Sequence, residues 1–418
     1  MSRAAPQRVR LAGLDGLRAL AALTVVSYHV ARFSAFVGPL PALLWELKGG
    51  VALFFVISGT VLYLPYARAI RDGERLPDWR IYAGRRAVRI LPAYWIALTV
   101  VAAGPFAAGV FGPDLWRYYG LSQIYSPDTL FSGLGGAWSL CVEVTFYALL
   151  PLFARGAAAL AHRLGSRAGL RRHLFLIGLP ALASVLLRGA LTGSLTAPIQ
   201  DQGVTLSIAL SGFLDWFAIG MALAVLAAER EAGRAGARLL VGLAARPRWC
   251  VVLALLAFAV GIPAQHGDMF LPWYGLLTHV ALGIGSGLLV LAAIGRDGER
   301  ASSSPIRRLG SSCLTWLGTI SYGIYLWHLV VLELITSRPA PRSLEAVAGL
   351  WLAVVGGAVL LGAASYYLVE RPSQRWLRAR ESRLGRPVLG GRMTEMAGSV
   401  HSTLDPLNSP GQPVDQLA

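Results

Sequence analysis

The sequence predicts an all-α fold, a polytopic bundle of about ten transmembrane helices, and two observations carry this prediction. Of 418 residues, 55% are hydrophobic and only 14% are charged, and the mean hydropathy is +0.56. Soluble domains carry about a quarter charged residues. Apolar stretches of about 17 to 25 residues, long enough to cross ~30 Å of hydrocarbon, also recur along the chain. Backbone groups in lipid must be paired within the segment, so each stretch is expected to be a helix.

The apolar pattern divides the chain into ten expected spans separated by short polar loops. They are Gly16–Val37, Gly49–Ala67, Ile90–Phe111, Gly136–Ala154, Leu174–Ala190, Leu206–Ala228, Trp249–Ala264, Leu271–Ile294, Cys313–Ile335 and Leu344–Leu368. The first span is too long for the apolar core of a signal peptide and lacks a convincing cleavage site, so we expect it to stay in the protein.

The distribution of basic residues predicts the orientation of these spans. With the N-terminus inside, the inner segments hold 31 Lys and Arg residues and the outer loops hold 6, while Arg18 lies within the first span. Basic residues favour the cytoplasmic side, so both termini are expected in the cytoplasm. Arg outnumbers Lys 37 to 1, which suggests a GC-rich bacterial genome and therefore a bacterial inner membrane. The basic residues form no single patch, so the net charge of +16 does not predict a nucleic-acid partner.

The domain organisation expected from these segments is simple. Residues 1–372 form one membrane domain, and residues 373–418 form a polar tail rich in Arg, Ser, Pro and Gly. Such a composition cannot bury enough apolar surface to fold, so the tail is expected to be disordered and cytoplasmic. The cysteines at 141, 250 and 313 have no metal-ligand spacing and are expected to be small core residues, so no metal site is expected.

Ionisable side chains within spans are costly in lipid and therefore point to function. Five of them, together with Ser58, lie seven to nine residues from the outer ends of their spans: His29, Glu143, Asp215, His279 and His328. At 1.5 Å per residue this is a layer about 10–14 Å below the outer surface, and it predicts a polar cavity open to the outside. Helix-to-helix hydrogen bonding is the alternative, with Asp215 paired to His279 or His328. A proton relay in a transporter would show the same layer.

Arginines gather at the start of the third expected span. Arg86 and Arg89 are one turn apart and face the same way, and Arg85 precedes them. Guanidinium groups bind phosphate bidentately, so this pair suits a phosphorylated cytosolic ligand. An anchor that orients the span or contacts lipid headgroups is the alternative reading. In the first span, Arg18 and His29 share a helix face about 16 Å apart along the axis, with Arg18 on the inner side.

Six motifs in order resemble the acyltransferase-3 family of integral membrane O-acyltransferases. They are LDGLRALAALTVVSYH at 14–29, GVALFFVISG at 50–59, RRAVRILPAYW at 85–95, WSLCVEVTFYALLP at 138–151, LGTISYGIYLWH at 317–328 and VERP at 369–372. Each motif alone is weak. Their order and spacing cover nearly the whole chain and make the resemblance specific.

The resemblance implies transfer of an acetyl or other short acyl group from cytosolic acyl-CoA to a sugar hydroxyl. Arg86 and Arg89 are expected to bind the co-substrate acyl-CoA, with Arg18 as a further donor-binding residue. No tightly bound cofactor is implied. His29 is the expected catalytic base, oriented by Glu143 or by a neighbouring residue, and Glu143 is the second expected catalytic residue. The residues expected to line the acceptor cavity are Ser58, Trp138, Ser139, Tyr322 and His328, and hydrogen-bond donors such as Trp138 or Ser139 are expected to stabilise the oxyanion.

The acceptor is not determined by the sequence, because a cell-surface glycan and a glycosylated metabolite such as a macrolide fit equally. Asp215 and His279 match no family motif. Two other functions compete with the enzyme: a non-enzymatic transporter or flippase of a lipid-linked glycan, and a regulatory or scaffold membrane protein. Neither has an evident need for phosphate-binding arginines inside combined with a base near the outer face.

Overall fold

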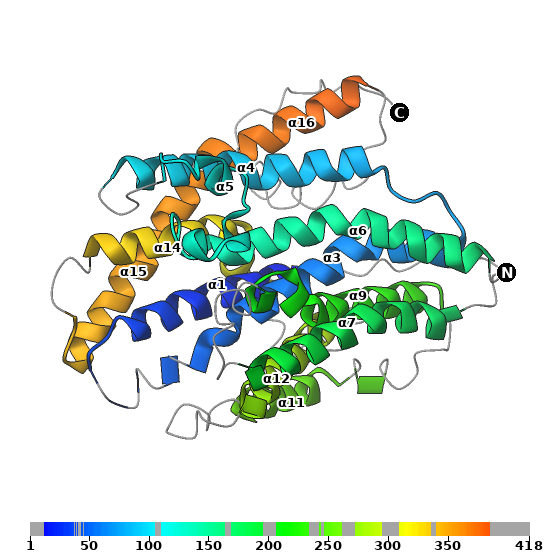
Figure 1. Cartoon of the computed structure of the whole chain (residues 1–418), viewed down its shortest axis with the longest axis horizontal. Coiled ribbons are helices and arrows are strands. Elements are labelled where there is room, and N and C mark those ends of the chain that lie inside the picture. The colour runs from blue at the N-terminus through cyan, green and yellow to red at the C-terminus, as the bar shows by residue number, and fades with distance from the viewer. Residues whose placement is uncertain are drawn as a thin grey trace, which may run out of the picture.

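The computed structural model describes most of the chain. The described residues are 12–36, 38, 40, 43–44, 46–104, 110–163, 169–194, 206–233, 242–243, 246–260, 272–294, 309–335 and 340–384. Within these ranges the chain is built from helices and contains no strand, which confirms the all-α fold class. The longest helices run side by side along the long axis of the molecule (Figure 1).

Each expected span contains a helix, and short helical turns fill several connections. The long helices are α1 (Ala12–Arg32), α3 (Gly50–Asp72), α4 (Trp79–Ala103), α6 (Ala137–Arg163), α7 (Gly169–Ser194), α9 (Leu214–Glu231), α11 (Pro247–Val260), α12 (Pro272–Ile294), α13 (Ser312–Thr319), α14 (Ser321–Ile335), α15 (Leu344–Ser365) and α16 (Arg371–Arg383). The short elements are α5 (Leu115–Tyr119), the 3₁₀ turns η1 (Glu46–Gly49), η2 (Gln123–Tyr125), η3 (Pro127–Thr129) and η5 (Leu210–Gly212), and the π-helical turn η9 (Tyr366–Glu370).

Six of these helices are long and apolar enough to cross a membrane: α3, α4, α6, α7, α12 and α15. A seventh crossing arises if α13 and α14 count as one span, but they are bent by 68° at Ile320, where one continuous helix was expected. The sixth expected span is also shorter than predicted, since α9 begins only at Leu214 after a 3₁₀ turn. The protein is therefore a multi-pass membrane protein, while the count of ten spans stays a prediction.

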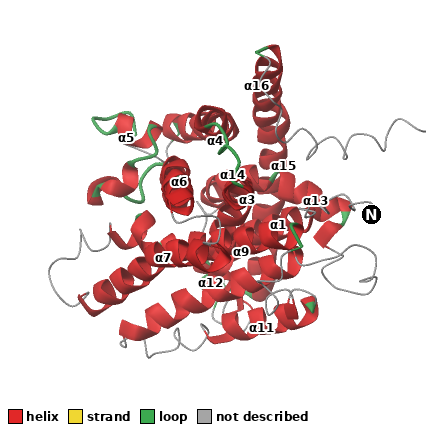
Figure 2. Cartoon of the chain, turned by 90° about the vertical axis from the view of Figure 1, so that its right-hand side faces the viewer, coloured by secondary structure: helices red, strands yellow, loops and turns green. Residues whose placement is uncertain are grey.

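Helices α3 and α9 form the closest pair in the bundle, and both lie near its middle when it is viewed along the helices (Figure 2). Gly59 of α3 and Gly220 of α9 allow this approach. A Cβ at Gly59 would lie 2.3 Å from the Phe217 carbonyl oxygen, and one at Gly220 would lie 2.1 Å from that of Val56. Small residues that let two backbones touch are typical of helix pairs in membranes.

The C-terminal helices return to the arginine-bearing helix α4. The helix α15 continues through the π turn η9 into α16, and both η9 and α16 pack against α4. Residues 371–383 are thus helical although most of them were expected to belong to a disordered tail, because Glu381 is buried against Arg85 of α4. The rest of the expected tail, residues 385–418, lies outside the described residues.

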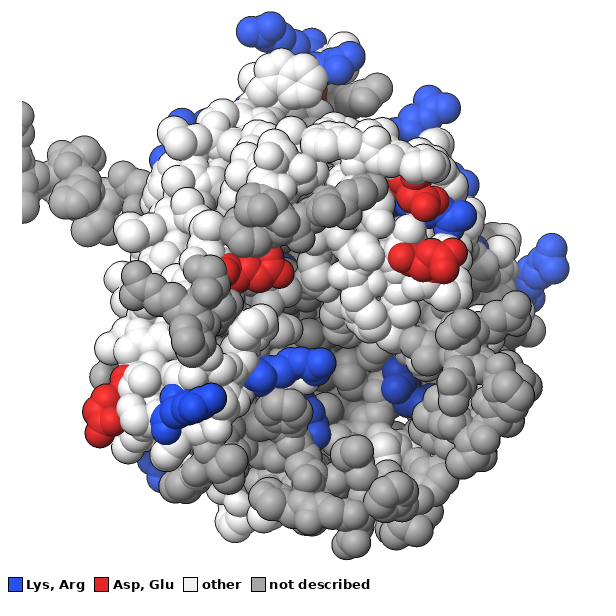
Figure 3. Space-filling view, turned by 60° about the vertical axis from the view of Figure 1, so that its left-hand side comes forward, with Lys and Arg blue, Asp and Glu red and all other residues white. Residues whose placement is uncertain are grey.

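Charged side chains are sparse on the face of the molecule shown in Figure 3, where scattered Lys, Arg, Asp and Glu are separated by uncharged surface. Helix α7 illustrates the reason, since only 11% of its most apolar 18-residue window is buried within the protein. Several of its large apolar side chains, among them Phe175, Leu182 and Leu186, are exposed. An apolar helix with an exposed surface of this kind matches a lipid environment.

Candidate active site

A pocket with about 710 Å³ of empty space, part of it open to solvent, lies between α1, α3, α4, α6 and α14. Its lining combines three arginines (Arg18, Arg86 and Arg89) with one carboxylate, Glu143. Hydroxyl groups of serine and tyrosine and a few apolar side chains from α3 complete it. The cavity therefore offers cation, carboxylate and hydroxyl chemistry within one enclosure, in a part of the chain where charged groups are otherwise rare.

Helix α6 supplies one stripe of this lining through its periodicity. Ser139, Glu143 and Tyr147 are four residues apart and so lie above one another on one helix face. The stripe covers eight residues, or about 12 Å along the axis. Ser139 is near the beginning of α6, at the end of the cavity occupied by hydroxyl groups, and Tyr147 is nearer the arginines.

The arginines come from two helices. Arg86 and Arg89 follow one another on the inner face of α4, which begins at Trp79 because the Asp78 side chain accepts a hydrogen bond from the Arg80 amide at 2.8 Å. Arg18 of α1 lines the same cavity and is 3.7 Å from Asp15. Within the described part of the chain, no ion pair or hydrogen bond engages the Arg86 or Arg89 guanidinium, so both charges face the cavity.

Arg85 points the other way and is held by the C-terminal helix. Its Nη2 lies 2.8 Å from Oε2 of Glu381, and its Nε lies 3.2 Å from both oxygens of that carboxylate. The Glu381 side chain is only 5% exposed. This pair ties α4 to α16, while the neighbouring Arg86 and Arg89 line the cavity.

Glu143 is held by two hydroxyl groups across the cavity. Ser58 of α3 donates to Oε1 at 2.7 Å, and Tyr147, one turn further along α6, donates to Oε2 at 3.0 Å. Glu143 was expected to orient His29, but the structure gives it these two partners instead. Tyr147 was not predicted from the sequence, although its position four residues after Glu143 was a signal for the contact.

His29 lies beside His328, a contact between α1 and α14. His328 Nε2 is 3.3 Å from His29 Nδ1, and the ring centroids are 5.0 Å apart. The His328 side chain is 0% exposed, whereas that of His29 is half-buried. Neither histidine lines the large cavity. Tyr325 connects the two places, because it lines the cavity and its ring is 5.5 Å from that of His328.

Backbone carbonyls determine which nitrogen of each histidine carries the proton. His29 Nδ1 is 2.9 Å from the Val25 carbonyl oxygen, and His328 Nδ1 is 2.6 Å from that of Tyr325. A carbonyl only accepts, so each Nδ1 must carry the hydrogen and each neutral Nε2 must hold a lone pair. The single His29 Nδ1–H is then shared between the Val25 carbonyl and His328 Nε2, and the lone pair of His29 Nε2 has no hydrogen-bond partner within the described residues.

A hydroxyl network joins α6 to α14 at the end of the cavity next to this histidine pair. Tyr325 donates to the Gly136 carbonyl at 2.9 Å, and the Ser139 and Tyr325 hydroxyls are 2.5 Å apart. Ser139 was expected in the cavity lining, and the structure places it there. Tyr325 was missed, although it lies one turn before His328 in the last long motif.

Two further expected lining residues are engaged elsewhere. Tyr322 borders the cavity, but its hydroxyl donates to the Ile90 carbonyl at 2.9 Å and so ties α14 to α4. Trp138 is not part of the cavity lining, because it points toward Phe213, whose ring is 5.6 Å away. The expected role of Trp138 in stabilising an oxyanion stays a prediction.

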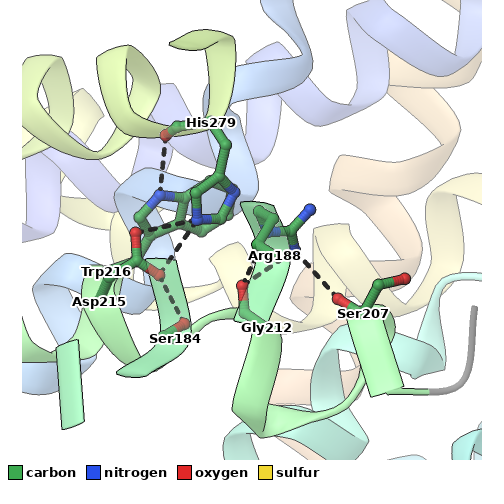
Figure 4. Close-up of polar contacts among 7 residues, drawn as sticks. All are labelled: Ser184, Arg188, Ser207, Gly212, Asp215, Trp216 and His279. Atoms are coloured by element: carbon green, nitrogen blue, oxygen red, sulfur yellow. Dashed lines mark hydrogen bonds and ion pairs between the residues drawn. The ribbon is translucent and has the colours of Figure 1, made fainter. Parts of the chain in front are cut away.

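Asp215 and His279 form a separate buried cluster (Figure 4). His279 Nε2 lies 2.9 Å and 3.1 Å from the two Asp215 oxygens, and Ser184 donates to Asp215 at 3.1 Å. Trp216 stacks on the His279 ring at 4.3 Å and donates to the His279 carbonyl at 3.0 Å. The cluster ties α7, α9 and α12 together, so the helix-to-helix alternative describes it. The expected single polar layer is thus divided into three places: this cluster, the His29–His328 pair and Glu143.

Comparison with known proteins gives a consistent result. Residues 11–369 match the model of a family described as an acyltransferase domain. The chain is 29% identical over 354 residues to the exopolysaccharide production protein ExoZ of Rhizobium meliloti (strain 1021), covering 83% of this chain and 94% of ExoZ. It is 27% identical over 393 residues to the putative peptidoglycan O-acetyltransferase YrhL of Bacillus subtilis (strain 168), covering 86% of this chain and 54% of YrhL.

A third relative is the O-acetyltransferase OatA of Staphylococcus aureus (strain MRSA252), 24% identical over 410 residues, with 91% of this chain and 61% of OatA covered. The chain therefore spans about half to three fifths of the length of YrhL and OatA, and nearly all of ExoZ. No solved structure matches the chain.

Proposed function

The chain belongs to this acyltransferase family, and we propose that it is a membrane O-acyltransferase that moves an acetyl or other short acyl group from acyl-CoA to a sugar hydroxyl. The family resemblance carried by the six motifs is confirmed. The observation that carries the proposal is one cavity with Arg86 and Arg89, which have no ion pair within the described residues, at one end and hydroxyl groups next to a histidine pair at the other.

The arginine end suits the donor. Acyl-CoA carries several phosphates, and guanidinium groups bind phosphate through paired, charge-assisted hydrogen bonds. Arg86 and Arg89 have no carboxylate partner within the described residues, so their charge is available to a ligand. With the phosphates at this end, the flexible arm of the donor extends along the stripe of α6 toward Ser139 and Tyr325.

The histidine pair suits a general base. The His29 Nε2 lone pair takes the proton of the acceptor hydroxyl, and the oxygen attacks the thioester carbonyl carbon. The carbon–sulfur bond then breaks, the sugar ester forms, and the proton passes to the CoA sulfur. His328 stabilises the imidazolium because its Nε2 accepts from His29 Nδ1–H. The Ser139 hydroxyl, once it turns away from Tyr325, is a donor for the carbonyl oxygen in the transition state.

The relatives support a glycan acceptor. One is named for exopolysaccharide production and another as a putative peptidoglycan O-acetyltransferase. We therefore propose a hydroxyl of a cell-surface polysaccharide as the acceptor in preference to the sugar of a macrolide. Such glycans are assembled at the outer face of the membrane, so the histidine pair must be reached from that face. This orientation requires both termini to be cytoplasmic. Reporter fusions after Arg117 and after Arg300 should then report opposite sides of the bacterial inner membrane.

Inverted membrane vesicles test the proposal. Vesicles containing the full chain are given acetyl-CoA labelled in the acetyl group, and alkali-released acetate is then measured in purified peptidoglycan, in exopolysaccharide and in an added glycosylated macrolide. We expect label in a glycan fraction, and none with His29→Ala at an equal membrane level. Label in the macrolide alone would reassign the acceptor. An unlabelled product in every fraction would contradict acyl transfer and favour a transporter.

A further inference from the structure

A second, smaller cavity adjoins the large one at its hydroxyl end. The two share Leu140 and Tyr325 in their walls. The remaining wall of the small cavity is apolar or glycine, with Gly135 and Gly136 before α6 and Leu326 and Leu329 on α14. It has room for little more than one water-sized group.

The small cavity is better suited to a methyl group than to water. A buried water needs two to four polar partners. The polar groups bordering this space are the Tyr325 hydroxyl and the Gly136 carbonyl, and these two are already hydrogen-bonded to each other. His328 lies on the adjoining side, since a Cβ at Gly136 would be 3.8 Å from His328 Cε1.

We propose that this cavity is the subsite for the alkyl end of the transferred acyl group, and that its size selects acetyl over longer acyl chains. The inference rests on the proposed function, because it requires donor phosphates at the arginines and the thioester at the opposite end. An acetyl methyl in the small cavity leaves the carbonyl beside Ser139 and Tyr325, next to the histidine pair. A longer chain has no space beyond Leu326 and Leu329.

The two glycines leave this space open. A Cβ at Gly135 or at Gly136 would lie 3.5 Å from Leu329 Cδ1, which is ordinary van der Waals contact. Alanine at either position is therefore accommodated without a clash, but its methyl group occupies part of the subsite. Leu329 on the opposite wall limits the depth, so shortening it lengthens the subsite.

Three variants of the full chain in nanodiscs test the subsite. Leu329→Ala enlarges it, Gly136→Ala narrows it, and Leu334→Ala removes the same atoms from an exposed position of the same helix as a control. The affinities of acetyl-, propionyl- and butyryl-CoA are measured by calorimetry, with free CoA as the reference. Gel filtration confirms that each variant is folded.

The wild type and Leu334→Ala should bind acetyl-CoA most tightly. Leu329→Ala should shift the preference to propionyl- or butyryl-CoA, by about fourfold for each newly buried methylene. Gly136→Ala should weaken all three thioesters while leaving the affinity of free CoA unchanged. Equal ratios among the three thioesters in the wild type and both subsite variants would overturn the subsite and leave the proposed function intact. Failure of the wild type to bind any thioester would overturn both.

Discussion

The Asp215–His279 pair and the His29–His328 pair differ in their surroundings and in what they present to a ligand. In the Asp215–His279 pair, the ring nitrogen that faces the carboxylate is bonded to both oxygens, and Trp216 covers the ring. In the His29–His328 pair, two backbone carbonyls accept hydrogen bonds from the Nδ1–H groups. The His29 Nε2 lone pair has no protein partner within the described residues. The first pair joins helices. The second presents a base next to a cavity.

Depth in the membrane does not distinguish these two pairs, since the sequence assigns all four residues to the same layer. Their surroundings do, because the His29–His328 pair lies beside Tyr325 of the large cavity, whereas neither Asp215 nor His279 lines that cavity. A buried polar group with its donors and acceptors satisfied rigidifies the core, whereas an unsatisfied acceptor beside a cavity is a candidate for chemistry. The following variants test this distinction.

His29→Ala should have the largest effect. Loss of a general base typically lowers the rate by about 10²–10⁴, so kcat for acyl transfer should fall by this amount while the protein still inserts and folds. His29→Gln should fail equally, because an amide cannot take the proton. His328→Ala should lower kcat less, because it removes only the support of the imidazolium. Initial rates at saturating acetyl-CoA measure both, and near wild-type turnover by His29→Ala would remove the base from the mechanism.

Arg86→Ala and Arg89→Ala should each raise the donor KM, with kcat much less affected. A charge-assisted hydrogen bond is worth about 1.5–3 kcal/mol, which corresponds to roughly a 10- to 150-fold change. Arg80→Ala is the matched control, because it removes the same charge from an exposed position of α4. An unchanged KM in the double variant of Arg86 and Arg89 would return these residues to the role of a membrane anchor.

Glu381→Arg should raise the donor KM by less than Arg86→Ala does, because it acts only through the rotation of α4. The exchange Arg85→Glu with Glu381→Arg restores the ion pair and should restore KM, which a simple loss of stability would not predict. Arg383→Glu, an exposed charge change on the same helix, serves as the control. A double variant no better than either single variant would refute the positioning role of α16.

Asp215→Asn and His279→Ala should have the smallest effect on activity, with kcat within about twofold of wild type. Both should lower stability, and His279→Ala should lower it more, because it leaves a buried carboxylate with only Ser184 as a partner. Leaving such a group unsatisfied costs about 1–3 kcal/mol. Thermal unfolding in detergent measures this loss. A folded His279→Ala protein as inactive as His29→Ala would erase the contrast between the two pairs.

The sequence predicted the helices well because apolar length and local pairing of the backbone determine them. It located ten segments that each contain a helix, and it aligned Arg86 with Arg89 through the 3.6-residue period alone. It did not predict the bend at Ile320, because the two segments together are apolar and long enough for one continuous span. The helical start of the expected tail was missed for a different reason, since α16 depends on Glu381 meeting Arg85 almost three hundred residues away.

The site was predicted by residue type more successfully than by partner. Ser58, Ser139 and Tyr322 line the cavity as expected, whereas Glu143 bonds to Ser58 and Tyr147 and not to His29. The depth of a residue along its helix gives its level in the membrane. It does not give the direction in which the side chain points around the bundle axis, so it does not show which residues at one level are in contact. Tyr325 was overlooked because a tyrosine in an apolar motif looks like ordinary core.

The contact between His29 and His328 joins residues 299 positions apart, and this separation has a consequence for biogenesis. At about 5–20 residues per second, the ribosome needs roughly 15–60 s to synthesise the chain between them. During that time the first helix is in the membrane with Asp15, Arg18 and His29 but without its partner helix α14. Polar groups in that position are costly in lipid, so we expect early neighbours such as α3, which packs against α1, to cover this helix until α14 has been made.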